Sequence, residues 1–387
     1  MRVCFLFNHY ATHQVMHAAP FAFELARRHA KVEVVIACTS EEQMAAVQRI
    51  ASLYPGQRAE FVLLRMPLRD RVASAALSGF TFLAKNQMLR RNLDFFRGFD
   101  AVVAPERQML KLRREFGLDR LKLINTRHGQ GDREGSFDER TREIDLTLVA
   151  GQKYLDRFAE HGILREGHTA VVGYAKFEVC DRLSPPRRLF ADERPVVVYN
   201  PHFDKRESSW QKQGRAVLDW FAAQRDYNLV FAPHVVLFER AWRHRARLPK
   251  RIRVAPNIRV DTGSEASMDM SYTRAADIYL GDVSSQVYEF IERPRPCVFI
   301  DAQRARAADH DKYMHWRFGP IIERADQLGE ALEIAQRDFA AYVDAQREAF
   351  EYTFSTDRER TPGQRGADAI AEFLEKGRIA SKCYRAG

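Results

Sequence analysis

The sequence predicts an α/β protein with two doubly wound, Rossmann-like domains, a cleft between them and helices at the C-terminal end. Short β-branched runs alternate with helical stretches twice along the chain, which is typical of βαβ units and parallel sheets. One stretch rich in proline and charge interrupts this alternation near the middle of the chain. A length of 387 residues is enough for about two to three domains with hydrophobic cores.

The first half shows the clearer alternation. We expect strands at 2–7, 32–37, 60–64, 100–104, 122–126, 146–150 and 170–172, and helices at 17–30, 41–53 and 152–161. Strands separated by helices of this length indicate a parallel sheet. We therefore assign 1–180 to a first domain, followed by a linker at 181–194.

After the linker the alternation restarts. We expect strands at 195–199, 228–231, 278–281 and 297–300, a weaker strand at 252–254, and helices at 210–224, 268–274 and 284–291, with 325–375 helical. These elements form a second domain at 195–376, and 377–387 is expected to be a loose tail.

The composition is that of a soluble globular protein, with 45% apolar and 29% charged residues. The cysteines are scattered and include no CxxC pair, which argues against a disulfide framework and a zinc site. Cys4, Cys38 and Cys297 lie in apolar runs and are expected to be buried. The cysteine usage therefore favours a reducing compartment.

The N-terminal apolar run is too short for a signal peptide, and no run approaches a membrane span of about 18 residues. We expect a cytoplasmic protein. The net charge of +9 suggests an anionic partner, either a phosphorylated substrate or an anionic membrane surface. Nucleic acid is not expected, because there is no zinc-finger spacing, RNP-type aromatic motif or concentrated basic tract.

The segment 65–91 has two interpretations. Residues 72–84 are uncharged, and basic residues flank them at Arg65, Arg69, Arg71, Lys85, Arg90 and Arg91. Such a segment suits peripheral contact with the inner face of an anionic membrane. The alternative is a buried helix of the first domain with a solvated basic rim.

Polar loops follow two strands of the first domain. Asn8 and His9 follow the first strand, and a glycine-rich loop with His128 follows the strand at 122–126. His128 is placed where a general base would meet a hydroxyl group, and Asp132 and Glu134 are rival bases. The alternative for this loop is a glycine-rich turn with a solvated histidine.

Two loops of the second domain place a histidine after a proline at a strand end. These histidines are His202 and His234. An imidazole in such a position could donate to a phosphate or to a leaving oxygen. The alternative is a satisfied, buried histidine at each position.

The strand at 278–281 ends in a polar turn before a helix. The turn and the start of the helix contain Asp282, Ser284, Ser285 and Gln286, with Glu289 one helical turn further on. Free backbone N–H groups, the helix dipole and the serine hydroxyls would form an anion site there. The alternative is ordinary N-capping by Asp282 or Ser284.

Metal binding is not expected. His9, His13 and His17 have a spacing that would line one helical face, but Pro20 lies close by and no carboxylate follows at ligand spacing. The P-loop, the GxSxG elbow and the GxGxxG turn are also missing from the sequence.

Residues 195–325 resemble the catalytic domain of CDP-glycerol glycerophosphotransferases of the teichoic-acid polymerase type. The similarity lies in the stretches VVVYNPHFDKRESSW, NLVFAPHVVLF, DTGSEASMDMSYTRAADIYLGDVSSQVYEFIERPRPCVFID and HDKYMHWRFGPI. A shorter similarity occurs at His128-Gly129. The D-x-S-S turn, the helix and the R-P strand ending in Asp301 follow the order of that family. The chain departs from it at Arg127, where the family has Trp, and at 201–204, where the family has Pro-Thr-Trp-Arg.

This resemblance implies a GT-B fold and a metal-independent transferase that needs no cofactor. The first domain would serve a glycan or lipid-linked acceptor, and the second would bind a nucleotide-diphosphate donor such as CDP-glycerol. By resemblance, His128 would activate the acceptor hydroxyl, while His234, Ser284 and Ser285 would hold the phosphates of the donor. The donor set also contains His202, Asp282, Gln286 and Glu289, and the acceptor set contains Asn8, His9, Arg127, Gly129 and Arg133.

Other functions compete with this interpretation. A UDP-sugar glycosyltransferase differs only in that the acceptor attacks a sugar carbon and releases the nucleoside diphosphate. A UDP-GlcNAc 2-epimerase-like isomerase has a similar site and needs no acceptor. A non-catalytic basic protein would bind membranes or nucleic acid with a steep salt dependence and no nucleotide preference.

Overall fold

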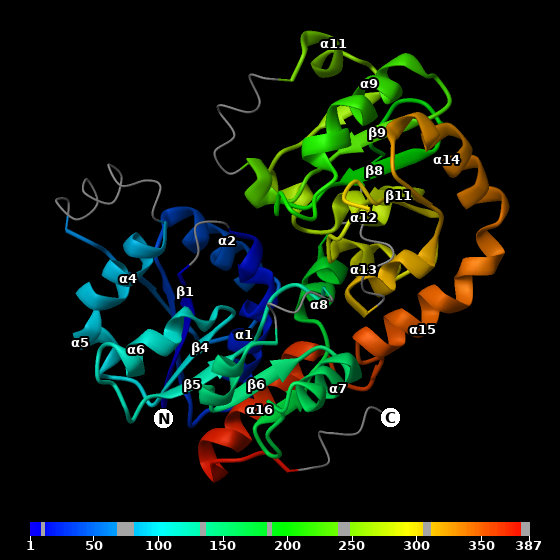
Figure 1. The fold of residues 1–387 in the computed structure, drawn as a ribbon. Coiled ribbons are helices and arrows are strands. Elements are labelled where there is room, and N and C mark those ends of the chain that lie inside the picture. Colours follow the sequence, from blue (N-terminus) through cyan, green and yellow to red (C-terminus); the bar gives the residue numbers. More distant parts are fainter. Residues whose placement is uncertain are drawn as a thin grey trace. The chain divides into compact units, whose positions relative to one another are not determined.

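The computed structural model divides into two compact units (Figure 1). It describes residues 1–8, 12–67, 81–131, 137–183, 188–238, 248–304 and 311–380. Unit 1 consists of the described residues within 1–128, 137–183 and the chain from 354 onward. Unit 2 consists of the described residues within 129–136 and 184–353. Each unit contains one parallel sheet, as the alternation of strands and helices predicted.

The sheet of unit 1 has seven parallel strands in the order β3-β2-β1-β4-β5-β6-β7. The strands are β1 (Arg2–Phe7), β2 (Glu33–Cys38), β3 (Glu60–Leu63), β4 (Ala101–Ala104), β5 (Lys122–Asn125), β6 (Leu146–Val149) and β7 (Thr169–Val171). The helical segments of this unit are η1 (Thr12–His17), α1 (Ala19–Arg28), α2 (Glu41–Ala51), α4 (Thr81–Arg91), α5 (Leu93–Phe96), η2 (Arg107–Leu110), α6 (Lys111–Arg114), η4 (Glu139–Glu143), α7 (Gln152–Glu160), α8 (Ala175–Arg182) and α16 (Pro362–Lys376).

The central strand of this sheet is apolar on both faces. Val3, Phe5 and Phe7 of β1 share one core with α1, α2 and α16. Cys4 and Leu6 share a second core with α4 and α5. Because successive side chains of a strand point to opposite faces, a continuous apolar run is what a sheet covered on both sides requires.

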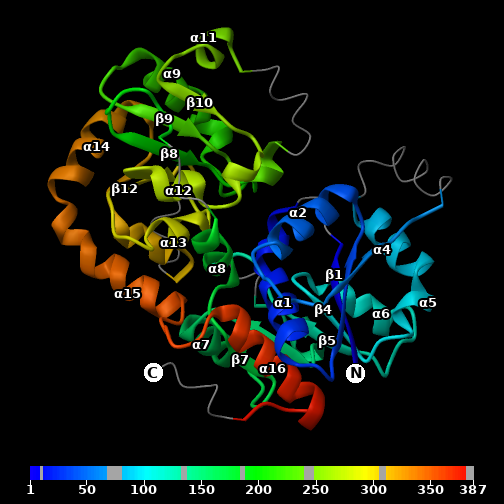
Figure 2. The ribbon, with the colours of Figure 1, turned by 180° about the vertical axis from the view of Figure 1, so that it is seen from behind.

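The sheet of unit 2 has six parallel strands in the order β10-β9-β8-β11-β12-β13. The strands are β8 (Val196–Asn200), β9 (Asn228–Phe231), β10 (Ile258–Val260), β11 (Ile278–Gly281), β12 (Cys297–Ile300) and β13 (Ile321–Ile322). The helical segments are η5 (Trp210–Gly214), α9 (Arg215–Ala223), η6 (Val235–Phe238), α11 (Lys250–Arg253), η7 (Glu265–Ser267), α12 (Ser271–Ala275), α13 (Gln286–Phe290), η8 (Asp311–Phe318), η9 (Ala325–Gln327), α14 (Leu328–Arg337), η10 (Phe339–Tyr342) and α15 (Val343–Thr353). Helices α9 and α14 cover one face of the sheet (Figure 2).

Most predicted elements are confirmed, but the weak strand expected at 252–254 is wrong. The structure forms helix α11 there, directly after Pro249, and strand β10 follows only at Ile258–Val260. β10 pairs in parallel with β9, with Ile258 opposite Leu229. The β-branched composition around Ile252 reflects a buried helical side chain instead of a strand.

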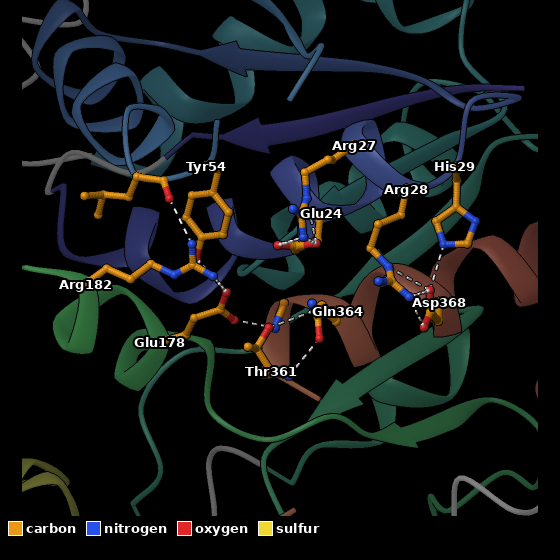
Figure 3. A network of polar contacts seen from close by, with 12 residues as sticks. Glu24, Arg27, Arg28, His29, Tyr54, Glu178, Arg182, Thr361, Gln364 and Asp368 are labelled. Carbon is orange, nitrogen blue, oxygen red and sulfur yellow. Dashed lines mark hydrogen bonds and ion pairs between the residues drawn. The ribbon is translucent and has the colours of Figure 1, made fainter. Parts of the chain in front are cut away.

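The helix predicted for the end of the second domain belongs to unit 1. α16 packs on α1 so closely that a Cβ atom at Gly366 would lie 2.2 Å from the ring of Phe21. Arg28 and His29, at the C-terminal end of α1, reach Asp368 at 3.2 and 2.8 Å (Figure 3). The assignment of this helix to the second domain is therefore wrong, because its small residues match a surface on α1.

A buried carboxylate fixes the start of α16. Glu178 of α8 accepts hydrogen bonds from the backbone N–H of Gly363 (2.7 Å), the hydroxyl of Tyr54 (3.0 Å) and the guanidinium of Arg182 (2.9 Å), as Figure 3 shows. Burial and the neighbouring carboxylate of Glu178 raise the pKa of Tyr54, so its hydroxyl remains a donor. This network joins segments from both ends of the chain within unit 1.

Two further expectations need correction. The segment after α16 is not entirely a loose tail, because Ile379 is buried and its N–H donates to the carbonyl of Gly167 (2.9 Å). In the basic segment 65–91, residues 68–80 lie outside the described part, but Lys85 is buried and pairs with Glu106 at 3.1 Å. Lys85 therefore does not belong to an exposed basic rim.

The cysteines within the described part are buried and form no disulfide with one another. These are Cys4, Cys38, Cys180 and Cys297, whereas Cys383 lies outside it. Burial raises the pKa of Cys38 to about 12, so this thiol stays protonated. Among the helices that the structure describes, none is long and apolar enough to cross a membrane.

Candidate functional site

Both sheets contain a switch point, where the strand order reverses. It lies between β1 and β4 in unit 1 and between β8 and β11 in unit 2. In doubly wound sheets, ligands bind beyond the carboxyl ends of the strands at this point. The predicted residues His128, His202 and Asp282 follow β5, β8 and β11, so the structure places them at these sheet ends.

His128 is held at both ring nitrogens. Its Nδ1 atom lies 3.3 Å from the carbonyl oxygen of Pro105, and its Nε2 atom lies 3.3 Å from the side-chain nitrogen of Gln14. A carbonyl oxygen only accepts hydrogen bonds, so Nδ1 carries the hydrogen and the neutral ring has its lone pair on Nε2. Part of His128 remains exposed, which leaves this residue accessible to a substrate.

A chain of polar side chains continues from Gln14. The Gln14 side-chain nitrogen also donates to Oε1 of Glu106 at 3.1 Å. Lys85 of α4 approaches the other carboxylate oxygen of Glu106 at 3.1 Å. Gln14 and Lys85 are both buried, so this chain is part of the interior behind His128.

The surroundings favour the neutral form of His128. The protein around the ring desolvates its charged form and so lowers its pKa, the carboxylate of Glu106 and the Pro105 carbonyl oppose this, and the cations of Arg127 and Lys85 lower it further. The result is a pKa below the ordinary value of a histidine. This shift favours the unprotonated ring, which is the state that a general base needs.

Arg127 contributes its backbone to this turn, whereas its side chain points into a core. Its φ angle of +57° lies in the left-handed region, and Gly129 follows with a φ of +66°. A left-handed conformation costs a residue other than glycine about 1–3 kcal/mol. The guanidinium of Arg127 lies 4.5 Å from the ring centre of Tyr154 and 5.5 Å from that of Phe158. The predicted acceptor residue is thus anchored by aromatic rings.

The remaining candidates of unit 1 give less information. Asn8 is half-buried after β1, and its side-chain nitrogen lies 3.4 Å from the backbone carbonyl of Lys85. The candidates outside the described residues are His9, Asp132, Arg133 and Glu134.

Asp282 organises the switch point of unit 2. Its fully buried carboxylate accepts the backbone N–H groups of His202 (2.9 Å), Ser209 (2.6 Å) and Val283 (2.7 Å), and the hydroxyl of Ser209 (2.8 Å). Burial raises the pKa of Asp282 and these hydrogen bonds oppose that effect. Asp282 therefore positions the loop after β8, a different task from the donor contact that we expected.

The backbone of Asp282 is also held. Its carbonyl oxygen accepts hydrogen bonds from Nε2 of His315 (2.8 Å) and from the indole N–H of Trp316 (3.2 Å). These two side chains belong to η8, which lies more than thirty residues further along the chain. The turn after β11 is therefore fixed from two sides, by the loop after β8 and by η8.

His202 and His234 share one tautomer. The backbone N–H of Asp204 donates to Nδ1 of His202 (3.2 Å), and that of Val236 donates to Nδ1 of His234 (3.3 Å). Because Nδ1 accepts in both rings, the hydrogen of each neutral ring lies on Nε2. The ring centres are 5.5 Å apart. The Nε2–H groups of His202 and His234 thus lie at the ends of two adjacent strands.

An exposed aromatic ring accompanies these histidines. Phe203 is 36% exposed, and its ring centre lies 4.3 Å from that of His202 and 4.8 Å from that of His234. Its exposed aromatic face beside the two imidazoles makes Phe203 a candidate platform for a planar ligand group.

The serine turn after Asp282 is weaker than its sequence suggests. Ser284 is buried and its hydroxyl accepts the N–H of Gln286 at a long 3.4 Å, while Ser285 is half-buried. Helix α13 has only five residues, so its dipole adds little to anion binding. Glu289 is buried within this helix and does not extend into solvent.

Several residues of these sites were missed by sequence reasoning. Gln14, Lys85 and Glu106 lie in η1, in α4 and after β4, and no short motif connects them. Glu106 could have been found, because it follows a strand end as His128 does. Phe203 and Ser209 lay inside the quoted stretch after β8 without being assigned a role.

Among the described residues, no group of at least three His, Cys, Asp or Glu side chains gathers around a common point as metal ligands would. His13 and His17 lie in η1. Burial and the nearby Lys176 lower the pKa of His17 well below its ordinary value. His17 is therefore a neutral, buried side chain in unit 1.

The chain matches no protein-family model and no curated protein sequence. Its fold is nevertheless similar to solved enzymes. S. aureus MnaA in a structure with UDP matches with a TM-score of 0.61 and 10% identity, over 97% of this chain and 96% of that chain. The wall teichoic acid polymerase TagF matches with a TM-score of 0.58 and 14% identity, over 97% of this chain and 89% of that chain.

A third neighbour is CalG4, the calicheamicin glycosyltransferase. It matches with a TM-score of 0.52 and 17% identity, over 97% of this chain and 98% of that chain. Identities this low establish the fold alone. The chain therefore has a GT-B-like architecture of two parallel-sheet α/β units, as the sequence predicted.

Proposed function

We propose that this protein is a transferase that uses a nucleotide-diphosphate donor, most simply CDP-glycerol. It would move a glycerophosphate, a related alditol phosphate or a sugar to a hydroxyl group of a glycan or lipid-linked acceptor. The observation that carries the proposal is the shared Nε2–H tautomer of His202 and His234, which follow the adjacent strands β8 and β9 of unit 2. Two fixed N–H donors are suited to the oxygens of a diphosphate.

On this proposal unit 2 binds the donor. The imidazoles of His202 and His234 donate to phosphate oxygens, the hydroxyl of Ser285 adds a donor, and the exposed ring of Phe203 receives the base. Asp282 keeps the loop in place through its four hydrogen bonds. Donors fixed before the reaction stabilise charge on the leaving phosphate without reorganisation.

On the same proposal unit 1 activates the acceptor. The acceptor hydroxyl takes the place of the Gln14 amide at Nε2 of His128, the lone pair of that nitrogen takes the hydroxyl proton, and the oxygen forms a bond to the distal phosphorus of the donor. The bond between that phosphorus and the bridging oxygen breaks, and the nucleoside monophosphate leaves with the electron pair. For a sugar donor, the acceptor attacks the sugar carbon instead and the nucleoside diphosphate leaves.

Two further observations support this choice. The stretches at 195–325 resemble CDP-glycerol glycerophosphotransferases, and TagF has been studied after a soak with CDPG. MnaA, by contrast, was solved with UDP, so the architecture accommodates both pyrimidine nucleotides among its relatives in fold. The proposal includes no metal and no cofactor, and we expect full turnover in the presence of a chelator.

A nucleotide-sugar isomerase is the second candidate. The observation that favours it is Glu106, a second titratable group linked to His128 through Gln14. A reaction that removes and returns a proton uses two such groups. An isomerase would convert a nucleotide sugar without any acceptor.

Calorimetric titration of the protein with CMP, CDP, UMP, UDP and their glycerol and sugar conjugates tests the proposal. Tighter binding of cytidine ligands, weakened by His234→Ala, supports alditol-phosphate transfer. Preference for uridine ligands would instead indicate a glycosyltransferase or an isomerase. An isomerase forms product from the nucleotide sugar without an acceptor, whereas a glycosyltransferase does not. Binding of none of these nucleotides would overturn both assignments.

A further inference from the structure

We propose that Gln14, Glu106 and Lys85 are positioning residues that together hold His128 with its hydrogen on Nδ1 and its lone pair on Nε2. The proposal rests on the assignment of His128 as the base in the proposed function. The three side chains come from η1, the loop after β4 and α4. The proposed transfer reaction assigns no role to these three residues, and no short sequence motif connects them.

The hydrogen-bond directions along this chain allow one arrangement. Glu106 accepts at both oxygens, since Lys85 approaches one and the Gln14 amide approaches the other. The group of Gln14 that faces Glu106 must therefore be its NH2 group. The second hydrogen of that NH2 group points to Nε2 of His128, 3.3 Å away, which must accept it.

The contact of Nδ1 on the opposite side of the ring indicates the same tautomer independently. The carbonyl oxygen of Pro105 accepts a hydrogen bond at 3.3 Å, so the proton of the neutral ring belongs on Nδ1. Among the described contacts of Gln14, the hydrogen bond to Glu106 is the one that keeps the amide from rotating and presenting its oxygen to His128. An amide oxygen at Nε2 would favour the opposite tautomer, in which Nε2 carries the hydrogen and has no lone pair to act as a base.

The chain also brings opposite charges to one side of His128. Glu106 favours the imidazolium form and Lys85 opposes it. Within the described part of the chain, the titratable and charged groups that face the ring are Glu106, Lys85, Arg127, His13 and His17. Charge changes at Glu106 and Lys85 should therefore move the titration of His128 in opposite directions.

The experiment is an NMR titration of the full chain with the imidazole of His128 assigned by comparison with His128→Gln. Long-range proton–nitrogen spectra report which ring nitrogen carries the hydrogen. We expect the Nδ1–H tautomer in the wild type and a mixture of tautomers in Gln14→Leu. We expect Glu106→Gln to move the titration midpoint to lower pH and Lys85→Met to move it to higher pH, each by roughly half a pH unit or more.

Matched controls carry the same charge changes elsewhere in unit 1. Glu143→Gln removes a carboxylate from an exposed ion pair with Arg114, and Lys122→Met removes an exposed cation at the start of β5. Neither should move the midpoint of His128. An Nε2–H tautomer in the wild type, or equal displacements in all four charge variants, would overturn the proposal.

This test is separate from the proposed function. The tautomer and the midpoint are read from the free protein, so they hold or fail whatever the donor is. If Glu106→Gln abolishes turnover while the titration of His128 stays unchanged, Glu106 acts directly on substrate and the positioning role is wrong.

Discussion

The carboxylate of Asp282 accepts both the backbone N–H and the hydroxyl of Ser209, at 2.6 and 2.8 Å, across 73 residues of sequence. The Ser209 hydroxyl donates its single hydrogen to Asp282. The hydroxyl of Tyr199, 2.8 Å from Oγ of Ser209, must therefore donate to that oxygen. Ser209 directly precedes a π-helical turn at Trp210–Gly214, an irregularity that is frequent at functional sites. The loop with His202 and Phe203 is thus tied to the end of β11.

Asp282→Asn should therefore destabilise unit 2. An amide in place of the carboxylate leaves a buried donor without an acceptor, which costs about 1–3 kcal/mol for each such group. We expect a lower Tm in thermal unfolding followed by circular dichroism. Asp219→Asn is the matched control, because Asp219 lies at the surface beside Arg251 and should change stability little. Equal effects of the two substitutions would contradict the role of Asp282.

His202→Ala and His234→Ala should each weaken nucleotide binding. The loss of one N–H donor to a charged phosphate oxygen costs about 1.5–3 kcal/mol, or roughly 10- to 100-fold in Kd. Isothermal titration with CDP and with inorganic pyrophosphate measures this, and both ligands should respond. His161→Ala, at the end of α7 in unit 1, is the control and should bind both ligands as the wild type does.

Phe203→Ala should distinguish the contribution of the base to nucleotide binding from that of the phosphates. Loss of a stacking platform costs about 1–3 kcal/mol per base, so CDP should bind more weakly while pyrophosphate binds unchanged. Phe203→Trp should restore CDP binding. Val254→Ala removes another exposed apolar side chain and serves as the control. Weaker binding of pyrophosphate by Phe203→Ala would instead show that the ring maintains the conformation of its loop and does not stack on the base.

The pH dependence of turnover follows from the environment of His128. Its pKa is lowered from the ordinary histidine value, chiefly by burial, and the base works when neutral. Turnover should therefore be level around pH 7 and fall only as pH drops through this lowered pKa. His128→Ala should abolish turnover and leave nucleotide binding nearly intact. A variant that turns over at the wild-type rate would remove His128 from the mechanism.

Gly363→Ala should loosen the docking of α16. A Cβ atom there would lie 2.7 Å from Oε2 of Glu178, whose side chain is held by Tyr54 and Arg182. Such overpacking costs about 1–3 kcal/mol, visible as a lower Tm. Gly329→Ala in α14 is the matched control, since its nearest contact would be an ordinary 3.5 Å to Trp220. That substitution should leave stability unchanged or raise it slightly.

Local sequence patterns predicted the sheets well and the partners of remote elements poorly. β1, β9, β11 and β12 begin and end as expected, because apolar runs between polar turns carry that information locally. The docking of α16 on α1 depends on the fit of Gly366 against Phe21, which no pattern within either helix reveals.

The same distinction applies to the candidate site. His128 and His202 could be predicted, because each follows a strand end directly. Gln14 and Lys85 could not, because the strand order brings η1 and α4 to the same sheet end only after folding. The side-chain direction of Arg127 was also hidden, since its aromatic neighbours come from later segments.

The position of α16 also determines when unit 1 can be finished during synthesis. The chain from 354 onward completes the core that begins with β1, so the ribosome makes all of unit 2 before unit 1 has its last helix. At about 5–20 residues per second, the surface of α1 around Phe21 waits roughly ten seconds or more for its partner. During that interval an apolar surface of the nascent protein stays open to chaperones and to other chains.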